Sequence, residues 1–483
     1  MRFYNIVVIL LMMLTIHQLE AQEQIGLRTD NYSGVNSLLL NPANNLTSKF
    51  SWDVNLISFG HFTENNYAFI RNTNLIDILK NTDNIRPMTD FENESQIDPD
   101  VLILDYFDDN RNRYASTLTT ITGPSFMVNL DGVHSFGLFT NVRTAVSAQK
   151  IPASLSYYNI ERTALGDPID IPAFQVAGMA WSEIGLNYAY GQPTARGELG
   201  LGISLKFLNG YEAFFFENQA DISFTELPND TFSFSQAAVE FGLTTGNTDG
   251  EDFNRERNGG GLAVDLGFTY TLDGSEDSYL WKFSAAIVDF GRIKFNNSAE
   301  LHRLELSNAV SIDGTDYNGF ETVEDYTNTI SEQVLGDPTA SLVAREFSIW
   351  LPAALNLQAD YNIAPNFYAH ALLVQRLPIN LLGNTIERNN LLALTPRFEH
   401  RWFGASVPVV LYNWRDFRIG MSARIGFLTI GSDNIGSITR RSNFTGTDFY
   451  VGLKVNPFEL FSGDGGVPGW RPSKGKNVKC YQF

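Results

Sequence analysis

The stretch Leu199-Gly-Leu-Gly-Ile-Ser-Leu-Lys-Phe207 alternates large apolar residues with small or polar ones along its whole length. Side chains of a β-strand point to opposite faces in turn, so this strand has one apolar face and one small or polar face. The same alternation returns in stretches that begin at Leu262, Phe417 and Phe449. Many long strands of this kind are typical of a β-barrel that crosses a membrane.

The N-terminus has the features of a secretion signal. Arg2 precedes an apolar run from Ile6 to Leu14 that is too short to cross a bilayer as a helix, and Leu19-Glu-Ala21 resembles a cleavage site. We therefore expect residues 1–21 to be a signal peptide. No later apolar run reaches the length of a membrane-spanning helix, so the exported chain is expected to be either soluble or a barrel.

Composition excludes several classes of function. The chain has 483 residues and a formal net charge of −20, whereas a nucleic-acid surface needs basic patches. The acidic runs lack the regular oxygen spacing of a calcium loop, so we interpret them as solvated loops. Cys480 is the single cysteine, which excludes an internal disulfide.

Catalytic and metal-binding patterns are absent from the sequence. Five histidines follow the predicted signal peptide, and they are scattered without metal-binding spacing: His61, His134, His302, His370 and His400. The pair His134-Ser135 resembles the His and Ser of an outer-membrane lipase, but a polar pair beside a turn is far more often structural. We expect no enzyme activity, no metal and no cofactor.

Counting strand candidates predicts the size of the barrel. Asp131-Gly132 is the strongest hairpin signal, and about 14 to 16 strands are expected overall, with one of them over residues 416–428. Residues 144–172 are expected to form one of four long loops. Long loops on one side and short turns on the other are typical of outer-membrane barrels. We predict a hatch segment over residues 22–48, the barrel over 49–457 and a periplasmic tail over 458–483.

Charged residues on the polar faces of the strands are expected to point into the barrel. Two interpretations remain open for them: internal salt bridges that rigidify the wall, or a functional surface that is either a polar conduit or a docking surface for a plug. These predicted luminal residues are Lys206, Asp265, Arg397, Glu399, Arg418, Arg424 and Lys454.

Four motifs resemble known families. Asn41-Pro-Ala43 resembles the entry motif of the long-chain fatty-acid transporter superfamily, which includes the type IX secretion shuttle protein. Three stretches are similar to a Bacteroidota outer-membrane family of unknown function, namely 260–270, 288–295 and 426–433. The resemblance implies an all-β, antiparallel transmembrane barrel of about 14 strands, in a range of roughly 12 to 16, with long extracellular loops and an N-terminal hatch inside the lumen.

The hatch prediction also has support from the residues themselves. A run of three leucines is too apolar for a solvated terminus, so we expect it to pack inside the barrel next to the proline that follows. The predicted hatch residues are Leu38, Leu39, Leu40, Asn41, Pro42 and Ala43.

Two functions are compatible with such a barrel, which we expect in the outer membrane among lipid and lipopolysaccharide. The first is passive transport of a hydrophobic small molecule, through a pocket that the hatch leucines form with Phe214, Phe216 and Trp350. The same aromatics are also explained by strands packing beyond the bilayer. The alternative function is a structural or accessory role with other outer-membrane or periplasmic proteins in secretion, surface anchoring or barrel assembly. A continuous apolar pocket favours transport, and a filled lumen with apolar loops favours the accessory role.

Overall fold

The computed structural model describes residues 23–91, 98, 100–130, 132–246, 256–273, 279–317 and 322–455. The predicted signal peptide, the predicted tail over 458–483 and Cys480 lie outside the described residues. Within these ranges, no helix combines the length and the apolar character that crossing a membrane requires.

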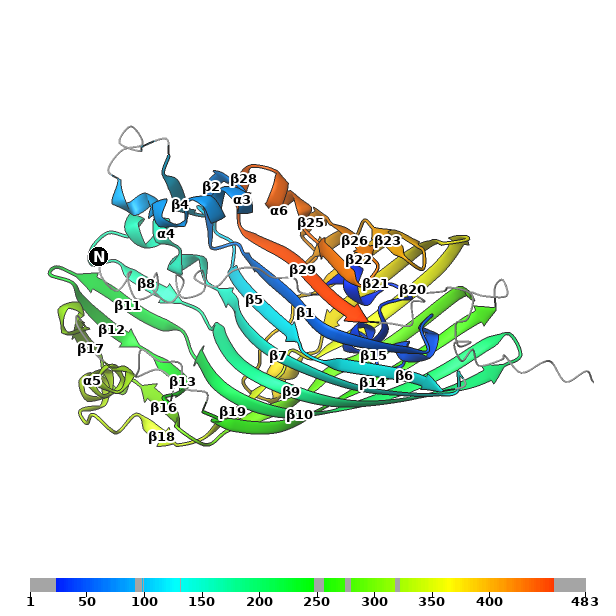
Figure 1. The fold of residues 1–483 in the computed structure, drawn as a ribbon. Coiled ribbons are helices and arrows are strands. Elements are labelled where there is room, and N and C mark those ends of the chain that lie inside the picture. The colour runs from blue at the N-terminus through cyan, green and yellow to red at the C-terminus, as the bar shows by residue number, and fades with distance from the viewer. Residues whose placement is uncertain are drawn as a thin grey trace, which may run out of the picture.

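One antiparallel sheet closes on itself and forms a barrel of 14 strands (Figure 1). The closing contact joins the first strand to the last, with Val54 opposite Val455 and Glu64 opposite Gly446. The predicted all-β antiparallel barrel is therefore confirmed. The order around the ring is β1 (Trp52–Asn65), β5 (Arg113–Thr122) with β6 (Ser125–Leu130), β7 (His134–Ile151), β9 (Gln175–Thr194), β10 (Gly197–Asn218), β14 (Gly259–Asp273), β15 (Tyr279–Phe295), β19 (Phe347–Trp350) with β20 (Ala354–Ala364), β21 (Phe367–Arg376), β22 (Leu391–Glu399), β23 (Phe403–Ser406) with β24 (Val409–Tyr412), β25 (Asp416–Ile419) with β26 (Met421–Ile425), β27 (Leu428–Ser432) and β29 (Gly446–Val455).

The two ends of the barrel differ in their connections. At the short-turn end, tight hairpins join the strands, and Gly132 supplies the positive φ of +69° between β6 and β7. At the long-connection end, three more strands continue the wall from the end of β10. They are β13 (Ala238–Thr244), β16 (Ala299–Glu305) and β18 (Leu342–Ala344). This difference matches the predicted asymmetry of loops and turns.

Two small sheets and several short helices also lie at the long-connection end (Figure 1). The first sheet has the order β17 (Val310–Asp313), β12 (Thr231–Gln236), β11 (Ile222–Leu227) and β8 (Pro168–Ile171), and the second β28 (Ser442–Phe444), β2 (Ala68–Thr73), β4 (Leu102–Tyr106) and β3 (Ile85–Pro87). The helices are α3 (Leu75–Lys80), α4 (Tyr157–Arg162), α5 (Val323–Leu335), α6 (Ile435–Thr439) and the 3-10 turns η3 (Thr82–Asn84), η4 (Met88–Asp90), η6 (Ala153–Leu155), η7 (Gly314–Tyr317) and η8 (Ile379–Leu382).

Two expected element boundaries are wrong. The single strand expected over 416–428 ends at Ile425, because Gly426 adopts a φ of +55° and turns the chain into β27. The loop expected over 144–172 begins later, since β7 continues to Ile151 while paired with β5 and β9.

The outer face of the barrel is apolar and the inner face is polar. On β10, Leu201, Ile203 and Leu205 are 53%, 46% and 37% exposed, whereas Ser204 and Lys206 between and beside them are buried. Exposed large apolar side chains recur on the outer face of strands all around the ring. Water does not favour so large an apolar surface, but lipid does. We infer that this barrel spans a membrane.

We predict that Ile203→Arg destabilises the barrel folded in lipid vesicles by about 2–4 kcal/mol, because a guanidinium would replace an apolar side chain in the hydrocarbon layer. Val343→Arg is the matched control, since Val343 is 49% exposed but lies on β18, outside the ring. The control should change stability by no more than about 0.5 kcal/mol. Equal losses in the two variants, measured by urea titration in vesicles, would contradict the assigned lipid face.

Candidate functional site

Residues 23–50, called the inner segment below, lie inside the barrel and are coloured dark blue in Figure 1. The segment contains α2 (Ile25–Arg28), η1 (Gly34–Leu39) and η2 (Asn44–Thr47). Its residues are buried or half-buried, with the exception of Lys49. The segment contacts strands on several sides of the ring: α2 packs on β26, β27 and β29, η1 on β1, β6 and β7, and η2 on β6, β7 and β9. Movement of this segment as a hatch stays a prediction.

The three leucines of the inner segment lie in the interior. Leu38 is fully buried in an apolar cluster with Val35, Phe50, Met127 and Phe139. Leu39 packs against the same cluster, and Leu40 is fully buried. The carbonyl of Leu40 accepts a hydrogen bond of 2.9 Å from Asn356 Nδ2 on β20. The inner segment is therefore joined to the wall by both apolar and polar contacts.

The Asn-Pro-Ala motif is attached to three strands. Asn41 Oδ1 accepts a hydrogen bond of 2.8 Å from the backbone nitrogen of Ala43, which closes a tight turn. Asn41 Nδ2 donates to the carbonyls of Phe268 on β14 at 2.9 Å and Ala285 on β15 at 3.4 Å. On the other side, Asn187 Nδ2 of β9 donates to the carbonyl of Pro42 at 2.9 Å.

Two glycines of the wall allow this close approach. Gly202 on β10 pairs with Gly267 on β14, and the Asn41–Ala43 turn lies directly against the pair. A Cβ atom on Gly202 would lie 2.4 Å from the carbonyl carbon of Pro42, and one on Gly267 would lie 2.7 Å from Pro42 Cδ. Both distances are shorter than real Cβ contacts, so only glycine fits at these positions.

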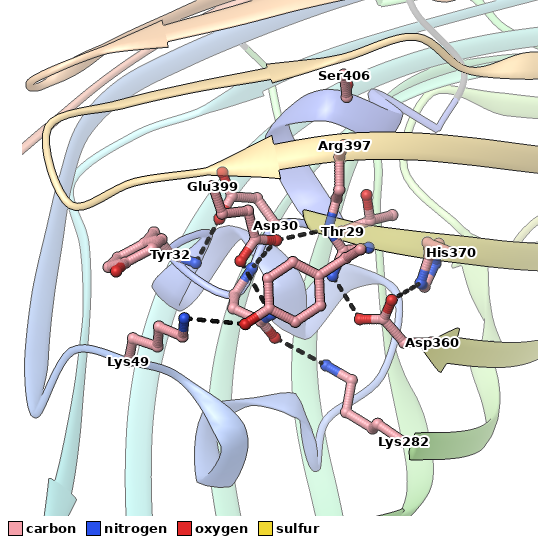
Figure 2. A network of polar contacts seen from close by, with 12 residues as sticks. Thr29, Asp30, Tyr32, Lys49, Lys282, Asp360, His370, Arg397, Glu399 and Ser406 are labelled. Atoms are coloured by element: carbon pink, nitrogen blue, oxygen red, sulfur yellow. Dashed lines mark hydrogen bonds and ion pairs between the residues drawn. The ribbon is translucent and has the colours of Figure 1, made fainter. Parts of the chain in front are cut away.

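A polar network joins the inner segment to β20 and β22 (Figure 2). Arg397 forms ion pairs with Asp360 and, at 2.5 Å, with Glu399. Glu399 in turn accepts hydrogen bonds from the backbone nitrogen and the side-chain amide of Asn31, at 3.2 and 3.0 Å. The nearby Lys49 donates to the hydroxyl of Tyr368 at 3.1 Å. Arg397 thus holds two carboxylates in the orientation that receives the inner segment.

Three further cations hold the last strands of the ring. Arg424 on β26 pairs with Asp30 of the inner segment at 3.1 Å. Lys454 on β29 pairs with Asp53 at 3.3 Å and donates to the carbonyl of Tyr32. Arg418 on β25 pairs with Glu64 on β1. Two of these cations therefore contact the inner segment, and the third stays within the wall.

A second charged cluster lies on the β7–β15 side of the interior. Lys206 on β10 lies 2.7 Å from carboxylate oxygens of both Asp265 and Asp289. Arg143 on β7 reaches Asp289 with two nitrogens, at 2.9 and 3.1 Å. All four side chains are buried. A bidentate Arg–Asp contact and a shared lysine give this cluster a fixed geometry.

The connection between β21 and β22 also enters the interior. The backbone nitrogen of Glu387 donates to Ser147 Oγ of β7 at 2.9 Å, and Ile386 packs into an apolar cluster of the wall. Arg388 then pairs with Glu23 of the inner segment at 2.6 Å, and both side chains are buried. The inner segment is thus also bound to a connection that starts at the long-connection end of the barrel.

All the predicted luminal residues lie on the inner side of the wall, and all are buried except Arg418, which is half-buried. Lys206, Asp265 and Arg418 pair with other wall residues, whereas Glu399, Arg424 and Lys454 contact the inner segment. Arg397 belongs to the network that does both. Some of these residues therefore form ion pairs within the wall and others contact the inner segment, while a polar conduit stays a prediction.

Two apolar clusters lie in the interior toward the long-connection end. Trp181, Leu208, Phe215, Ile293 and Ile349 belong to one buried cluster there. A second cluster, around Phe62, Val288, Leu372 and Tyr412, lies beside it and includes Ile25 of the inner segment. Trp181 borders the charged cluster, because its ring lies 5.2 Å from the guanidinium of Arg143. We call the region of these two clusters, which also contains the Arg418–Glu64 ion pair, the apolar half of the interior, and the region of the inner segment and the charged cluster the charged half.

The predicted pocket residues do not come together. A β-bulge between Gly210 and Glu212 reverses the alternation of β10, so that Phe215 enters the interior cluster in place of its neighbours. Phe216 packs on Phe174 at 5.4 Å, whereas Trp350 packs on the exposed ring of Phe290 at 5.8 Å. Phe214 lies against Gly178 of β9. The side chains of Phe214, Phe216 and Trp350 therefore pack against different neighbours.

The pair His134-Ser135 is divided between the two faces of β7. His134 is exposed and lies against Tyr188, while Ser135 is buried and donates to the carbonyl of Val128 at 3.2 Å. Within the ranges that the structure describes, no group of three or more His, Cys, Asp or Glu side chains is arranged to hold a metal ion.

Several contact residues were missed at the sequence level. Asn187 and Asn356 occupy inner-face positions in strands whose outer positions are apolar, so alternation alone identifies them as luminal. Asp289 lies in the stretch 288–295 and has a positive φ of 58°, which no residue pattern indicates. Glu23 and Arg388 are 365 positions apart, so only the folded chain shows their contact.

We predict that Gly267→Ala loosens the Asn-Pro-Ala turn, because the added Cβ would overlap the Pro42 ring, and that it costs about 1–3 kcal/mol of stability. The measurement is the rate at which a maleimide labels Ala43→Cys in a Cys480→Ser background, since Ala43 is fully buried. Labelling should accelerate in Gly267→Ala. Gly436→Ala is the control, because its Cβ would meet its nearest atom at 3.6 Å. Identical labelling in the two alanine variants would contradict the tight fit.

No curated protein matches the chain in sequence. Among solved structures, the toluene transporter TodX of Pseudomonas putida is 10% identical with a TM-score of 0.38, covering 91% of this chain and 98% of that one. The toluene transporter TbuX of Ralstonia pickettii is 11% identical with a TM-score of 0.38, covering 90% and 97%. A FadL homologue of Pseudomonas aeruginosa is 7% identical with a TM-score of 0.23, covering 90% and 98%.

The sequence itself places the chain in a family. Residues 42–433 match the model of DUF5723, which is described as a family of unknown function. The match begins at Pro42 in the Asn-Pro-Ala turn and ends at Asp433, whose carboxylate accepts a hydrogen bond from the backbone nitrogen of Ile25 at 3.1 Å. It therefore covers most of the wall together with the part of the inner segment that touches Gly202 and Gly267. The chain belongs to the DUF5723 family of unknown function.

Proposed function

We propose that this protein is an outer-membrane barrel that admits hydrophobic small molecules, with the inner segment as its closure. One observation carries the proposal: the half of the interior that faces the long connections is lined by apolar side chains. The interior of a membrane barrel is ordinarily polar. An apolar interior offers a hydrophobic molecule the dry surroundings that such ligands prefer.

The charged half of the interior supplies the closure. A hydrophobic molecule in the apolar half meets Trp181 first and then the buried ion pairs of Arg143 and Lys206. Beyond them lies the inner segment, held by Glu399, Arg424 and Asn187. Passage therefore requires the inner segment to move. Separation of a buried ion pair that leaves one charge unpaired costs about 3–5 kcal/mol, so the closed state is the resting state.

The outer membrane is the location that these features support. Apolar side chains cover the outer face of the ring, short turns lie at one end and long connections at the other. The predicted signal peptide supplies the route of export. The immediate partners of the outer face are then membrane lipid and, on the cell surface, lipopolysaccharide.

A second candidate function is the structural or accessory role. It is favoured by the dense packing of the interior and by exposed leucines in the connection between β21 and β22. Leu381 and Leu382 of that connection are 81% and 58% exposed. Apolar residues at such exposed positions are typical of contacts with another protein.

We predict that Trp181 reports on ligand entry, because its ring lies in the apolar cluster at the border of the charged half. In a variant with Trp181 as the single tryptophan, titration with an alkylbenzene or a fatty acid should shift its emission in a saturable way. Ala177→Leu, which adds volume inside the same cluster, should weaken the response, whereas Leu201→Ala on the lipid face should not. A constant spectrum at saturating ligand, together with capture of one fixed outer-membrane partner, would favour the accessory role.

We also predict that deletion of residues 22–46 leaves a barrel that folds and conducts ions more readily than the full chain. The deletion removes the Asn-Pro-Ala turn and Glu23, so water can enter the charged half of the interior. Conductance in planar bilayers measures the effect, and Gly436→Ala, made in the full-length chain, is the control for a change outside the interior. Unchanged conductance of a folded deletion variant would exclude the inner segment as the closure.

A further inference from the structure

A small polar cavity lies between the inner segment and β15. Two cationic side chains, Arg28 of the inner segment and Lys282 of β15, contribute to its lining. The cavity is small, with room for one water molecule or one monatomic ion. The other lining residues belong to the inner segment and are Thr29, Asp30, Asn31, Gly34, Ser37, Asn44, Thr47 and Ser48.

Arg28 lacks a partner for its charge. The side chain is 4% exposed, and its guanidinium forms no ion pair or hydrogen bond with any residue that the structure describes. The carboxylate of Glu23 is engaged by two nitrogens of Arg388, and that of Asp30 by Arg424. Burial lowers the pKa of the Arg28 guanidinium to about 10, although the nearby Glu23 offsets part of the effect. The nearby carboxylates of Glu23 and Asp30 are thus engaged by other cations, and Arg28 has no direct ion pair with either.

Lys282 is in a similar position. It is 5% exposed and donates at 3.4 Å to Asn31 Oδ1 and Thr47 Oγ1, which is longer than an ordinary hydrogen bond. No carboxylate within the described ranges forms an ion pair with it. The nearby Asp360 is engaged by Arg397 and by the hydroxyl of Tyr279. Lys282 thus carries a buried charge that two neutral oxygens share.

The charges of the surrounding network do not balance. The network of Figure 2, extended by Arg424, contains one more cation than carboxylates when His370 is neutral. Its cations are Lys49, Lys282, Arg397 and Arg424, and its carboxylates are Asp30, Asp360 and Glu399. A buried charge without a counter-charge is strongly unfavourable, so the imbalance calls for an anion.

Ser48 supplies a neutral donor for such an anion. Its hydroxyl oxygen accepts a hydrogen bond of 3.2 Å from the backbone nitrogen of Phe50, which leaves the hydroxyl hydrogen available. The hydroxyls of Thr29, Ser37 and Thr47 already donate to backbone carbonyls. Ser48 can therefore donate into the cavity beside the two cations.

We propose that a small monovalent anion of the size of chloride binds in this cavity, held by Arg28, Lys282 and Ser48. The size of the cavity excludes phosphate and the carboxylate of a fatty acid. The anion joins the inner segment to β15, because one of its cations comes from each. This site does not depend on transport of any hydrophobic molecule.

The first test is thermal unfolding of the full protein in mild detergent at constant ionic strength, with chloride or bromide replacing gluconate, which is too large for the cavity. A ligand that binds only the folded state raises the melting temperature with the logarithm of its concentration. We expect this rise in the native protein and in Arg28→Lys, which keeps the charge. Lys282→Gln should lose the dependence on halide, whereas Lys294→Gln, on an exposed ion pair, should keep it. Equal melting temperatures of the native protein in chloride and gluconate would overturn the proposal.

The second test does not depend on variants that fold. Crystals of the native protein grown in bromide should show an anomalous peak in the cavity, within contact distance of the nitrogens of Arg28 and Lys282. A cavity without such a peak, or one that holds only water, would overturn the proposal. The peak and the halide dependence together would establish the anion as part of the folded protein.

Discussion

Closure of the sheet between β1 and β29 is the constraint on which the rest of the structure depends. A closed sheet has no free edge, and it gives every strand one face toward the surroundings and one toward the interior. The outer face is apolar, so the polar residues of each strand must lie inside. Those residues need partners in a space that a ring of this size does not fill by itself. The inner segment supplies both the volume and the partners.

The inner segment has little regular secondary structure, so its backbone needs hydrogen-bond partners on the wall. Its buried backbone groups have few helical or strand partners, so they must find hydrogen bonds elsewhere. Asn187 and Asn356 of the wall donate to its carbonyls, and Asn41 donates back to the wall. A short amide is suited to this role because it both donates and accepts. Gly202 and Gly267 then allow the backbones to approach closely enough for these bonds to form.

Alternation of residue types predicted this fold well because lipid imposes it on every strand. It assigned Ile203 to the outer face and placed Lys206, Asp265 and Arg397 inside. It failed where the backbone changes the alternation, as at the bulge after Gly210, because no residue type there indicates a bulge. It also could not pair the charges, because partners such as Glu23 and Arg388 meet only after the ring has closed around the inner segment. The faces were therefore predictable, whereas the site built between them was not.

A densely packed interior is compatible with transport when the energy of the closed state is considered. In the proposed function, the charged half would oppose apolar molecules and the apolar half would oppose ions, so the closed state would exclude both classes. If opening costs about 3–5 kcal/mol, the open state is populated at roughly 10⁻² to 10⁻⁴. A ligand that binds the open state more tightly shifts this population by its difference in affinity. In the proposed function, contacts at the border between the two halves, where Trp181 meets Arg143, would therefore determine how strongly a ligand favours opening.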